Sequence, residues 1–241
     1  METVIKIQNL TKIYPGDVKA ISHLTLNIRQ GIFGLLGPNG SGKTTLIKIL
    51  TAVIRPTSGS VKILGCDLKK ESNFIKRNIG YLPECLGLYE DMIGIAFLQY
   101  MGRLSGLSKK EAQDNAKRLL REVDLQKWEN TKIRRYSAGM KQRIAFAQSL
   151  LNNPQIIFLD EPTKGLDPLE RQKVLNKIKK IEEQGKTVFL SSHILVEIEK
   201  VAGCIAIINN GKLLFQGMTE EIKKKGGLSS VYQEVLIGQE S

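Results

Sequence analysis

Gly37-Pro38-Asn39-Gly40-Ser41-Gly42-Lys43-Thr44 is the stretch that decides the fold of this 241-residue chain. It fits the phosphate-binding loop pattern of two glycines five positions apart followed by Lys and Thr. The apolar run 31–36 before it predicts a short buried strand, and apolar residues at 46, 47, 50 and 53 predict a helix after it. A glycine-rich surface turn could match the same letters, but it would not require both flanks. Strand, loop and helix together predict that phosphate binds at a helix N-terminus.

Each position of this loop meets a demand of a nucleoside triphosphate. A glycine-rich backbone can turn its N–H groups inward around phosphate oxygens. Lys43 would bring a point charge to the β- and γ-phosphates, and the Thr44 hydroxyl would ligate Mg²⁺. The residues expected to contact the nucleotide in this segment are Gly37, Pro38, Asn39, Gly40, Ser41, Gly42, Lys43, Thr44 and Thr45.

Composition limits the class of protein. No apolar run approaches the roughly 18 residues that a membrane-spanning helix needs, and the N-terminus lacks the basic and apolar regions of a signal peptide, so a cytosolic protein is expected. The net charge of +12 favours acidic partners such as nucleic acid, anionic lipid or polyphosphate, although most of it is expected on solvated helix faces. Cys66, Cys85 and Cys204 are far apart in the sequence, without metal-ligand spacing, and are expected to be small buried hydrophobes.

A second apolar run ends in two carboxylates. The strand predicted from Ile156 delivers Asp160 and Glu161 at its C-terminal end, where ligand chemistry concentrates in open α/β sheets. Asp160 would hold Mg²⁺, and Glu161 would act as the general base on an attacking water. The alternative is a strand that simply ends in a polar turn.

His193 and Tyr14 are two further candidates. His193 follows another apolar strand, so it could hydrogen-bond the γ-phosphate or order Glu161 and the water. Tyr14 precedes the Pro15-Gly16 turn and could either stack on adenine or serve as a core or turn residue. His23 has no such context and is expected to be structural.

The pattern along the chain predicts an α/β fold. Residues 1–30 alternate around a turn and predict an antiparallel sheet, which residues 60–65 extend. Residues 86–152 read mostly as helices, one of them 109–123 and another 138–151. Short apolar runs at 156–159, 188–190 and 205–208 predict central parallel strands. The helix between the first two should start at Asp167 with Glu170 as its capping-box partner, and end at Gly185.

Tyr136-Ser137-Ala138-Gly139-Met140-Lys141-Gln142-Arg143 resembles the signature motif, commonly Leu-Ser-Gly-Gly-Gln, of ATP-binding cassette (ABC) ATPases. The other motifs of that family follow in order over about residues 3–225. Tyr14 takes the place of the A-loop, Glu84 of the Q-loop, Asp160 and Glu161 of Walker B, Asp167 of the D-loop, and His193 of the H-loop.

The resemblance implies an ABC-type P-loop NTPase fold: a RecA-like core, an N-terminal antiparallel β subdomain and an inserted α-helical subdomain. The expected boundaries are 1–85 and 153–225 for the core with the β subdomain, 86–152 for the helical subdomain, and 226–241 for a C-terminal tail. It also implies that Ser137, Ala138, Gly139 and Met140 cap the γ-phosphate held by a second subunit. ATP with Mg²⁺ would then be sandwiched in a homodimer or a heterodimer with another ABC ATPase.

Three positions depart from the family pattern. Ala138 stands where Gly is usual, so a left-handed backbone there would be strained. Lys164 replaces the usual Ser of the segment after Walker B. Glu84 stands where Gln is usual, which adds negative charge near the phosphates and near the expected metal, for which Thr44, Glu84 and Asp160 are the candidate ligands.

The resemblance favours the ATPase subunit of a transporter of the drug- or ion-exporter type. Such a subunit works with a separate transmembrane permease, beside which it would sit on the cytoplasmic face. Residues 85–105, including Leu88, Tyr89, Phe97 and Tyr100, would line part of the groove for that partner. The alternatives are an ABC ATPase that acts on nucleic acid or ribosomes, for which the charge is the only cue, and a nucleotide-binding regulator without turnover. No nucleic-acid partner is expected.

Overall fold

A six-stranded sheet forms the centre of the molecule, which a computed structural model describes over residues 2–237. Its order is β10-β9-β3-β8-β7-β6, and all neighbours are parallel except β10, which runs antiparallel to β9. The predicted central strands are confirmed, because every residue of β3, β7 and β8 is buried, as expected of a sheet covered on both faces. The strands are β3 (Ile32–Leu36), β6 (Ile79–Leu82), β7 (Ile156–Asp160), β8 (Thr187–Ser191), β9 (Cys204–Asn209) and β10 (Lys212–Met218).

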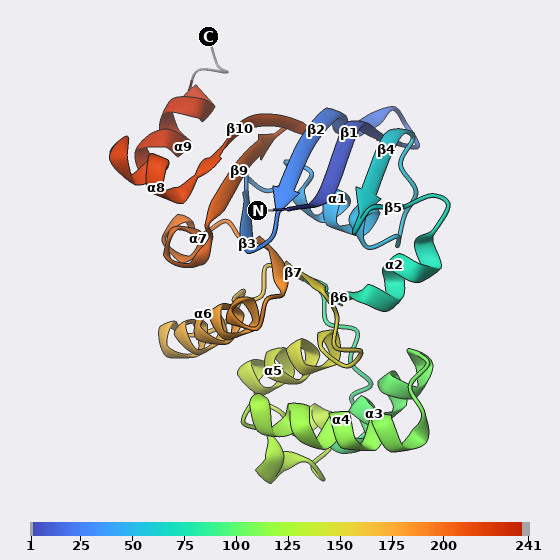
Figure 1. Cartoon of the computed structure of the whole chain (residues 1–241). Coiled ribbons are helices and arrows are strands. Elements are labelled where there is room, and N and C mark those ends of the chain that lie inside the picture. The colour runs from blue at the N-terminus through green and yellow to red at the C-terminus, as the bar shows by residue number, and fades with distance from the viewer. Residues whose placement is uncertain (1, 238–241) are drawn as a thin grey trace.

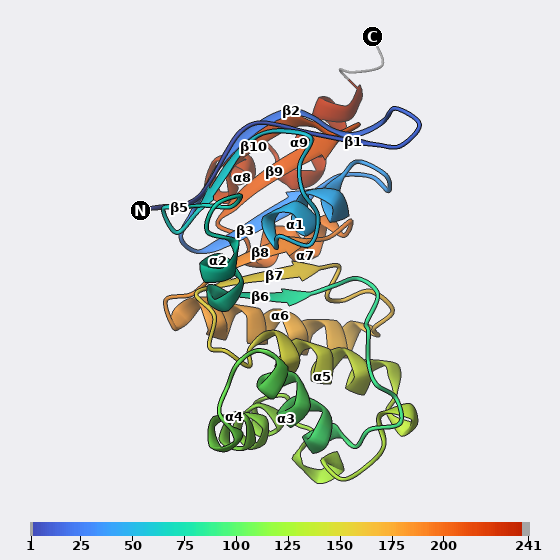
Figure 2. The same ribbon diagram turned by 90° about the vertical axis from the view of Figure 1, so that its right-hand side faces the viewer.

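A second, antiparallel sheet lies over one face of the first, as the N-terminal alternation predicts. Its order is β2-β1-β4-β5, with β1 (Thr3–Tyr14) and β2 (Val18–Arg29) joined at the Pro15-Gly16-Asp17 turn, β4 (Ser58–Ile63) and β5 (Cys66–Asp67). The helix α1 (Lys43–Leu50) lies between the two sheets (Figure 2). Its buried leucines and isoleucines share one core with residues of both sheets.

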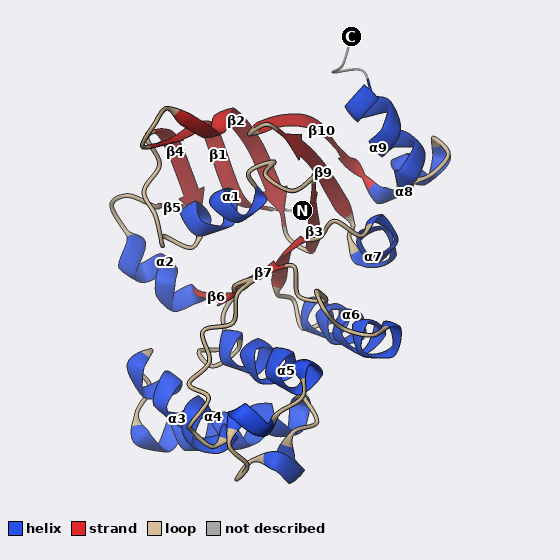
Figure 3. Ribbon diagram, turned by 180° about the vertical axis from the view of Figure 1, so that it is seen from behind, coloured by secondary structure: helices blue, strands red, loops and turns tan. Residues whose placement is uncertain are grey.

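The opposite face of the central sheet is covered by helices. A second core joins α5, α6 and α7 to residues of β3, β7, β8 and β9. The α3–α5 lobe hangs below the strands and contains no strand (Figures 1 and 3). The remaining helices are α2 (Ser72–Asn78), α3 (Gly94–Leu104), α4 (Lys109–Glu122), α5 (Ala138–Ser149), α6 (Pro168–Glu183), α7 (Leu195–Val201), α8 (Thr219–Lys224) and α9 (Leu228–Ile237), with 3₁₀ turns at Gln126–Trp128 and Ile133–Arg135.

Side-chain caps fix where two long helices begin. Ser108 starts α4 with a complete capping box, since its hydroxyl accepts from the Glu111 N–H and the Glu111 carboxylate accepts from the Ser108 N–H. Asp167 starts α6 as predicted, and Gly185, whose φ is +81°, follows the end of the helix. The prediction that Glu170 completes a capping box was wrong, because its carboxylate bonds Lys173 at 2.7 Å instead.

The structure corrects two predictions about exposure, one in the helical lobe and one at the cysteines. Phe97 is fully buried in the core of the lobe, so it does not line a partner groove, whereas Tyr89 and Tyr100 are exposed and stack edge to face at 5.7 Å. Cys85 is exposed in the loop after β6, and Cys66 and Cys204 are only partly buried, so the expectation of three buried thiols was wrong. A loop that crosses the end of a sheet has no second layer to cover its side chains.

The proposed domain limits stay predictions, although the elements follow them. Residues 86–152 hold helices and 3₁₀ turns, with one isolated β-bridge between Ile93 and Lys132. In the predicted C-terminal tail 226–241, α9 packs Leu228 and Val231 into the core, and residues 238–241 lie outside the described residues. Between residues 2 and 237 no helix is both long and apolar enough to cross a membrane.

Candidate ATP site

The phosphate loop connects β3 to α1 as the sequence predicts. Gly42 is the N-cap of α1 with φ +106°, a backbone that L side chains rarely adopt, and a Cβ there would strike the carbonyl oxygen of Ala20. A Cβ on Gly37 would strike the carbonyl oxygen of Ile208 and the Ser41 hydroxyl. The two glycines at the ends of the motif are therefore required by close packing, and they let the loop fold tightly around the start of the helix.

Lys43 is held inside this loop. Its Nζ donates to the carbonyl oxygens of Gly37 at 2.7 Å and Pro38 at 3.1 Å. Burial lowers the pKa of Lys43, while the nearby carboxylates of Glu161, Asp160 and Glu84 oppose that shift. The cation thus lies at the phosphate loop with acidic groups close by, where phosphate oxygens could replace the carbonyls as acceptors.

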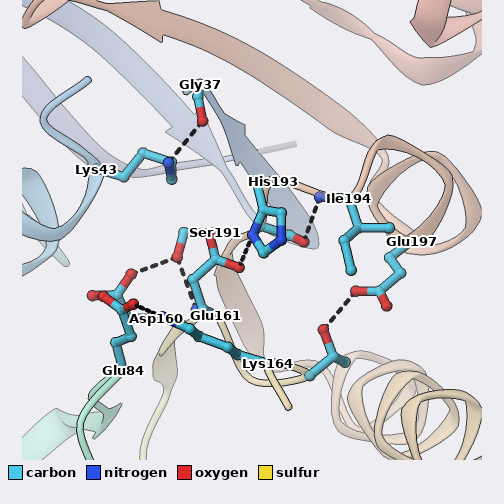
Figure 4. A network of polar contacts seen from close by, with 12 residues as sticks. Gly37, Lys43, Glu84, Asp160, Glu161, Lys164, Ser191, His193, Ile194 and Glu197 are labelled. Atoms are coloured by element: carbon cyan, nitrogen blue, oxygen red, sulfur yellow. Dashed lines mark hydrogen bonds and ion pairs between the residues drawn. The ribbon is translucent and has the colours of Figure 1, made fainter. Parts of the chain in front are cut away.

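Asp160 and Glu161 are positioned by Ser191 at the end of the neighbouring strand β8. The Ser191 hydroxyl donates to Asp160 Oδ1 at 2.6 Å and accepts from the Glu161 N–H at 3.1 Å (Figure 4). The backbone of Glu161 takes φ +51°, a left-handed conformation that is uncommon for a residue with a side chain. The bond from Ser191 helps to hold that turn, which directs the Glu161 carboxylate away from the sheet and toward His193.

His193 pairs with Glu161. Its Nδ1 lies 2.8 Å from Glu161 Oε2, the Glu161 side chain is 7% exposed, and the His193 side chain is 49% exposed. An ionised carboxylate can only accept, so the Nδ1 carries the proton and Nε2 is left for another partner. This contact is the one expected if His193 orders Glu161, the second of the two roles that the sequence predicts.

The carboxylate of Asp160 offers a place for a cation. Asp160 is fully buried, and its Oδ2 has no hydrogen-bond partner among residues 2–237. Burial raises the pKa of Asp160, an effect that the Ser191 and Thr44 hydroxyls partly offset and that Glu84 and Glu161 reinforce. No group of three or more His, Cys, Asp or Glu side chains converges within the described part of the chain. One buried carboxylate beside a hydroxyl fits Mg²⁺, which keeps waters and takes phosphate oxygens to complete its octahedron.

Glu84 and Lys164, two of the three departures from the family pattern, meet each other. Lys164 Nζ donates to Glu84 Oε1 at 2.6 Å, across 80 positions of sequence. This hydrogen bond and the charge of Glu84 raise the pKa of Lys164. The negative charge that Glu84 adds is therefore neutralised locally by Lys164. The serine that the family usually carries at position 164 has no charge and could not do this.

Tyr14 lies at the edge of the phosphate loop. Its hydroxyl is 3.5 Å from the Thr45 hydroxyl, and Lys12 Nζ lies 5.2 Å from the centre of its ring. The ring is partly buried and sits at the end of β1, next to the start of α1. This position suits a stacking platform beside a nucleotide held by the loop.

The signature segment lies apart from the phosphate loop. A depression of about 340 Å³ at the loop is lined by residues from Ala20 to Lys164 that include Lys43, Glu84 and Glu161, and none of residues 137–140 is among them. Ser137 caps α5, its hydroxyl accepting from the Met140 N–H at 3.2 Å, while Ser137 and Ala138 are exposed. A helix start leaves its first N–H groups without intrahelical partners.

Ala138 is not strained. It is the first residue of α5 and is absent from the left-handed residues of the described chain, so the strain expected from replacing the usual glycine does not arise. Asp167 lies at the start of α6, where its Oδ1 accepts from the Glu170 N–H at 2.9 Å. Neither residue lines the depression at the phosphate loop.

Four residues of the site were not singled out by sequence reasoning. Ser191 holds the Asp160 carboxylate and the backbone N–H of Glu161, and Gln142, Thr163 and Glu197 make buried hydrogen bonds around the segment that follows Glu161. Ser191 stands at a strand end two positions before His193, which is a signal that could have been used. The partners of the other three come from separate elements and leave no local pattern.

Comparison with known proteins identifies the family. The family model described as ABC transporter matches residues 21–164. The bacitracin transport ATP-binding protein BcrA of Bacillus licheniformis is 40% identical over 93% of this chain and 73% of its own length. The daunorubicin/doxorubicin resistance ATP-binding protein DrrA of Streptomyces peucetius is 35% identical over 92% and 68%.

Solved structures agree with these relatives. An ATP-binding subunit of an ABC transporter superposes with a TM-score of 0.86 at 28% identity, covering 97% of this chain and 100% of that one. The cassette MJ0796, in a dimeric post-hydrolysis state bound to ADP and Pi, gives a TM-score of 0.81 at 27% identity and covers 89% and 98%. Nothing in these comparisons favours action on nucleic acid. The chain therefore belongs to the ABC transporter family, as one of its ATP-binding and ATP-hydrolysing subunits.

Proposed function

We propose that this chain hydrolyses ATP at a site completed by a second cassette, and that the cycle powers export through a separate membrane permease. The observation that carries the proposal is the chain of contacts from Asp160 through Ser191 and Glu161 to His193, at strand ends that face Lys43. Lys43 and Glu161 line one depression at the phosphate loop, and the buried Asp160 carboxylate directly precedes Glu161, so a cation, an oriented base and a candidate metal ligand lie close together.

The roles follow from the chemistry of each group. Gly37–Thr45 binds the phosphates through backbone N–H groups, with Lys43 as the charge on the β- and γ-phosphates and Tyr14 under the adenine. Glu161 accepts a proton from the attacking water, and His193 holds that carboxylate in place. The His193 Nε2, which is an acceptor when Nδ1 donates to Glu161, can then accept a hydrogen bond from the attacking water.

Thr44, Asp160 and Glu84 are the residues that would hold Mg²⁺. The free Oδ2 of Asp160 and the Thr44 hydroxyl are oxygen donors of the kind this ion prefers, and Glu84 reaches it directly or through water. When bound, the ion neutralises charge on the triphosphate. Lys164 keeps Glu84 paired and so limits repulsion between its carboxylate and the phosphates.

The second cassette supplies the signature. The exposed N-terminus of α5, with Ser137, Ala138, Gly139 and Met140, is an anion site that has no phosphate partner in its own chain. Two chains arranged head to tail place each signature on the other's γ-phosphate, with Asp167 of each D-loop at the interface. The partner is a second copy of this chain or another ABC ATPase.

A mixing experiment tests this arrangement. Lys43→Ala disables the loop and Ser137→Arg disables the signature, so neither variant alone should turn over. In a two-fold dimer, a mixed pair has one site with both defects and one intact site. An equal mixture should therefore recover about a quarter of the wild-type rate if the two sites act independently. A mixture as inactive as its components, although mixed dimers form, would contradict the proposed head-to-tail site.

The relatives suggest the class of cargo. Two of them carry names for bacitracin transport and for daunorubicin and doxorubicin resistance. We infer that this chain, bound to the cytoplasmic face of its permease, drives export of a comparable compound. Recovery of the tagged chain from its own cells with a polytopic membrane protein that alters its ATPase rate would support this. Recovery with ribosomes or nucleic acid in a salt-sensitive complex would favour the other class.

A further inference from the structure

We propose that Glu197 is a positioning residue that keeps Glu161 and His193 aligned with each other and with the D-loop. The proposal rests on the roles given above to Glu161 and His193. Glu197 itself lies on α7, which begins two residues after His193, and it does not line the depression at the phosphate loop.

The first contact of Glu197 is with the segment that follows Glu161. The Thr163 hydroxyl donates to Glu197 Oε2 at 2.6 Å, and the two residues are 1% and 7% exposed. Figure 4 shows the Glu197 carboxylate turned away from His193, toward the other end of this network. A buried carboxylate is costly to desolvate, and an apolar residue of similar size would pack there at lower cost. The chain therefore places the Glu197 carboxylate at this position in spite of the free-energy cost of desolvating it.

The bond from Thr163 closes a ring of contacts. One side of the ring is the main chain from Glu161 through Pro162 to Thr163, and the other is the main chain from His193 into α7. The His193–Glu161 pair joins the two sides at one end, and the Thr163–Glu197 pair joins them at the other. Together with the Ser191 bonds at the strand ends, these two side-chain pairs fix the separation and the rotation of the two segments.

The second oxygen of Glu197 faces the D-loop helix. Arg171 lies with its Nη1 3.7 Å from Glu197 Oε1, and its Nε donates to the carbonyl oxygen of Leu166 at 2.7 Å. Leu166 directly precedes Asp167, the D-loop residue at the start of α6. One carboxylate is therefore connected to the base-bearing segment and, through Arg171, to the loop expected at the interface with the second cassette.

The same segment is tied to the signature helix from its other side. The Gln142 amide of α5 donates to the carbonyl oxygen of Pro162 at 2.7 Å, in a buried bond. Residues 162–163 thus form a junction between α5, whose N-terminus carries the signature, and α7, which follows His193. We infer that removing the Glu197 side of this junction misaligns the base while nucleotide binding stays intact.

Thr163→Val is the sharpest test, because it deletes one hydroxyl and keeps the shape of the side chain. Turnover by the full chain should fall roughly tenfold, since small misplacement of a general base costs this much or more, while KM for ATP stays within about twofold. Thr163→Ser, which restores the hydroxyl, should return turnover to near wild type. Glu197→Gln keeps an acceptor for Thr163 but loses the charge toward Arg171, so its loss should be smaller, about threefold.

Thr219→Val is the matched control. The Thr219 hydroxyl makes a buried bond to the carbonyl oxygen of Ala202, at the opposite end of α7 and away from the strand ends that carry the site. It should lower thermal stability about as much as Thr163→Val and leave turnover unchanged. Equal losses of turnover in both variants would overturn the proposal, as would wild-type turnover in Thr163→Val. Should Thr163→Val not fold, Glu197→Gln decides in its place, and wild-type turnover there would overturn the proposal.

A background substitution separates this proposal from the one it rests on. In a His193→Ala chain, Thr163→Val should reduce turnover further by less than twofold, because the aligned pair is already lost. A full additional tenfold loss would show that Thr163 acts by another route and would overturn the positioning role. Full turnover by His193→Ala itself would instead refute the role of His193 and with it the basis of both proposals.

Discussion

The phosphate loop and the signature segment belong to the same chain but differ in how much of their bonding they complete. At the loop, Lys43 is buried against two carbonyls, and Glu161 is held by Ser191 and His193. At the signature, Ser137 satisfies one N–H of its own helix and otherwise faces solvent. This difference fits the head-to-tail arrangement that we propose, because the loop is already organised within its own chain, whereas the start of α5 keeps N–H groups available for a phosphate bound by a second cassette.

The largest expected effect comes from Glu161→Gln, which should keep the phosphate loop of one chain bound through ATP to the signature segment of another. Glu161→Gln keeps the size of the side chain but removes the base, so hydrolysis should fall about 10³-fold. ATP binding should persist, and a stable ATP-bound dimer should accumulate in light scattering. Glu122→Gln, on the exposed face of α4, is the control and should behave as wild type. Full turnover by Glu161→Gln would remove the assigned base.

The next test disables the phosphate loop and the signature segment in separate variants. Lys43→Ala should weaken ATP binding to the isolated chain by roughly 30-fold, because a charge-assisted contact to phosphate is lost. Ser137→Arg should leave that affinity within about twofold and still abolish turnover, as its phosphate belongs to another subunit. Calorimetry on the monomer measures both values, with Lys62→Ala on exposed β4 as a control. Equal loss of affinity in both variants would place the signature at its own chain's nucleotide.

Substitution of Tyr14 tests whether the nucleotide site at the phosphate loop also includes a contact with the adenine ring. Tyr14→Ala should reduce affinity for ATP about tenfold through loss of stacking, whereas Tyr14→Phe keeps the ring and most of the affinity. Inorganic tripolyphosphate, which has no adenine, should bind all three chains alike. If the affinity for tripolyphosphate fell in parallel, the tyrosine would act through the loop and its contact with Thr45.

Lys164 and Glu84 test the charge balance of the same half. At a fixed Mg²⁺ concentration, Lys164→Ser should weaken binding of a fluorescent ATP analogue about fivefold, because Glu84 is left without its partner and its carboxylate then repels the phosphates. Adding Glu84→Gln should restore most of that loss, and the non-additivity measures the coupling of the pair. The effect is small because the Lys164 side chain is 58% exposed and water screens the interaction. Additive losses would show that the two residues act independently.

Ala138→Gly gives the smallest expected effect and sharpens the signature half. Ala138 has helical geometry, so restoring the glycine that the family usually carries should change turnover by less than about twofold. Thermal unfolding should show a loss below about 1 kcal/mol, from the lower helix propensity of glycine. A large gain in turnover would mean that the alanine limits the approach of a phosphate to the helix N-terminus.

The sequence was sufficient to predict those features of the molecule that depend on residues close together in the chain. The strand before Asp160, the cap at Asp167 and the turn at Pro15 each depend on neighbouring residues, and the structure confirms them. It failed where exposure or partners depend on distant elements. Cys85 and Phe97 were given the wrong exposure, and the Glu84–Lys164 and Thr163–Glu197 bonds join positions 80 and 34 residues apart.

The left-handed backbone at Glu161 has a consequence for engineering this chain. A side chain in that conformation costs on the order of 1 kcal/mol, and glycine adopts it freely. Screens for heat resistance should therefore tolerate or even enrich glycine at position 161, and those survivors would be inactive. Thermostable variants of this ATPase should be selected on turnover as well as on melting temperature, because at this residue the two properties oppose each other.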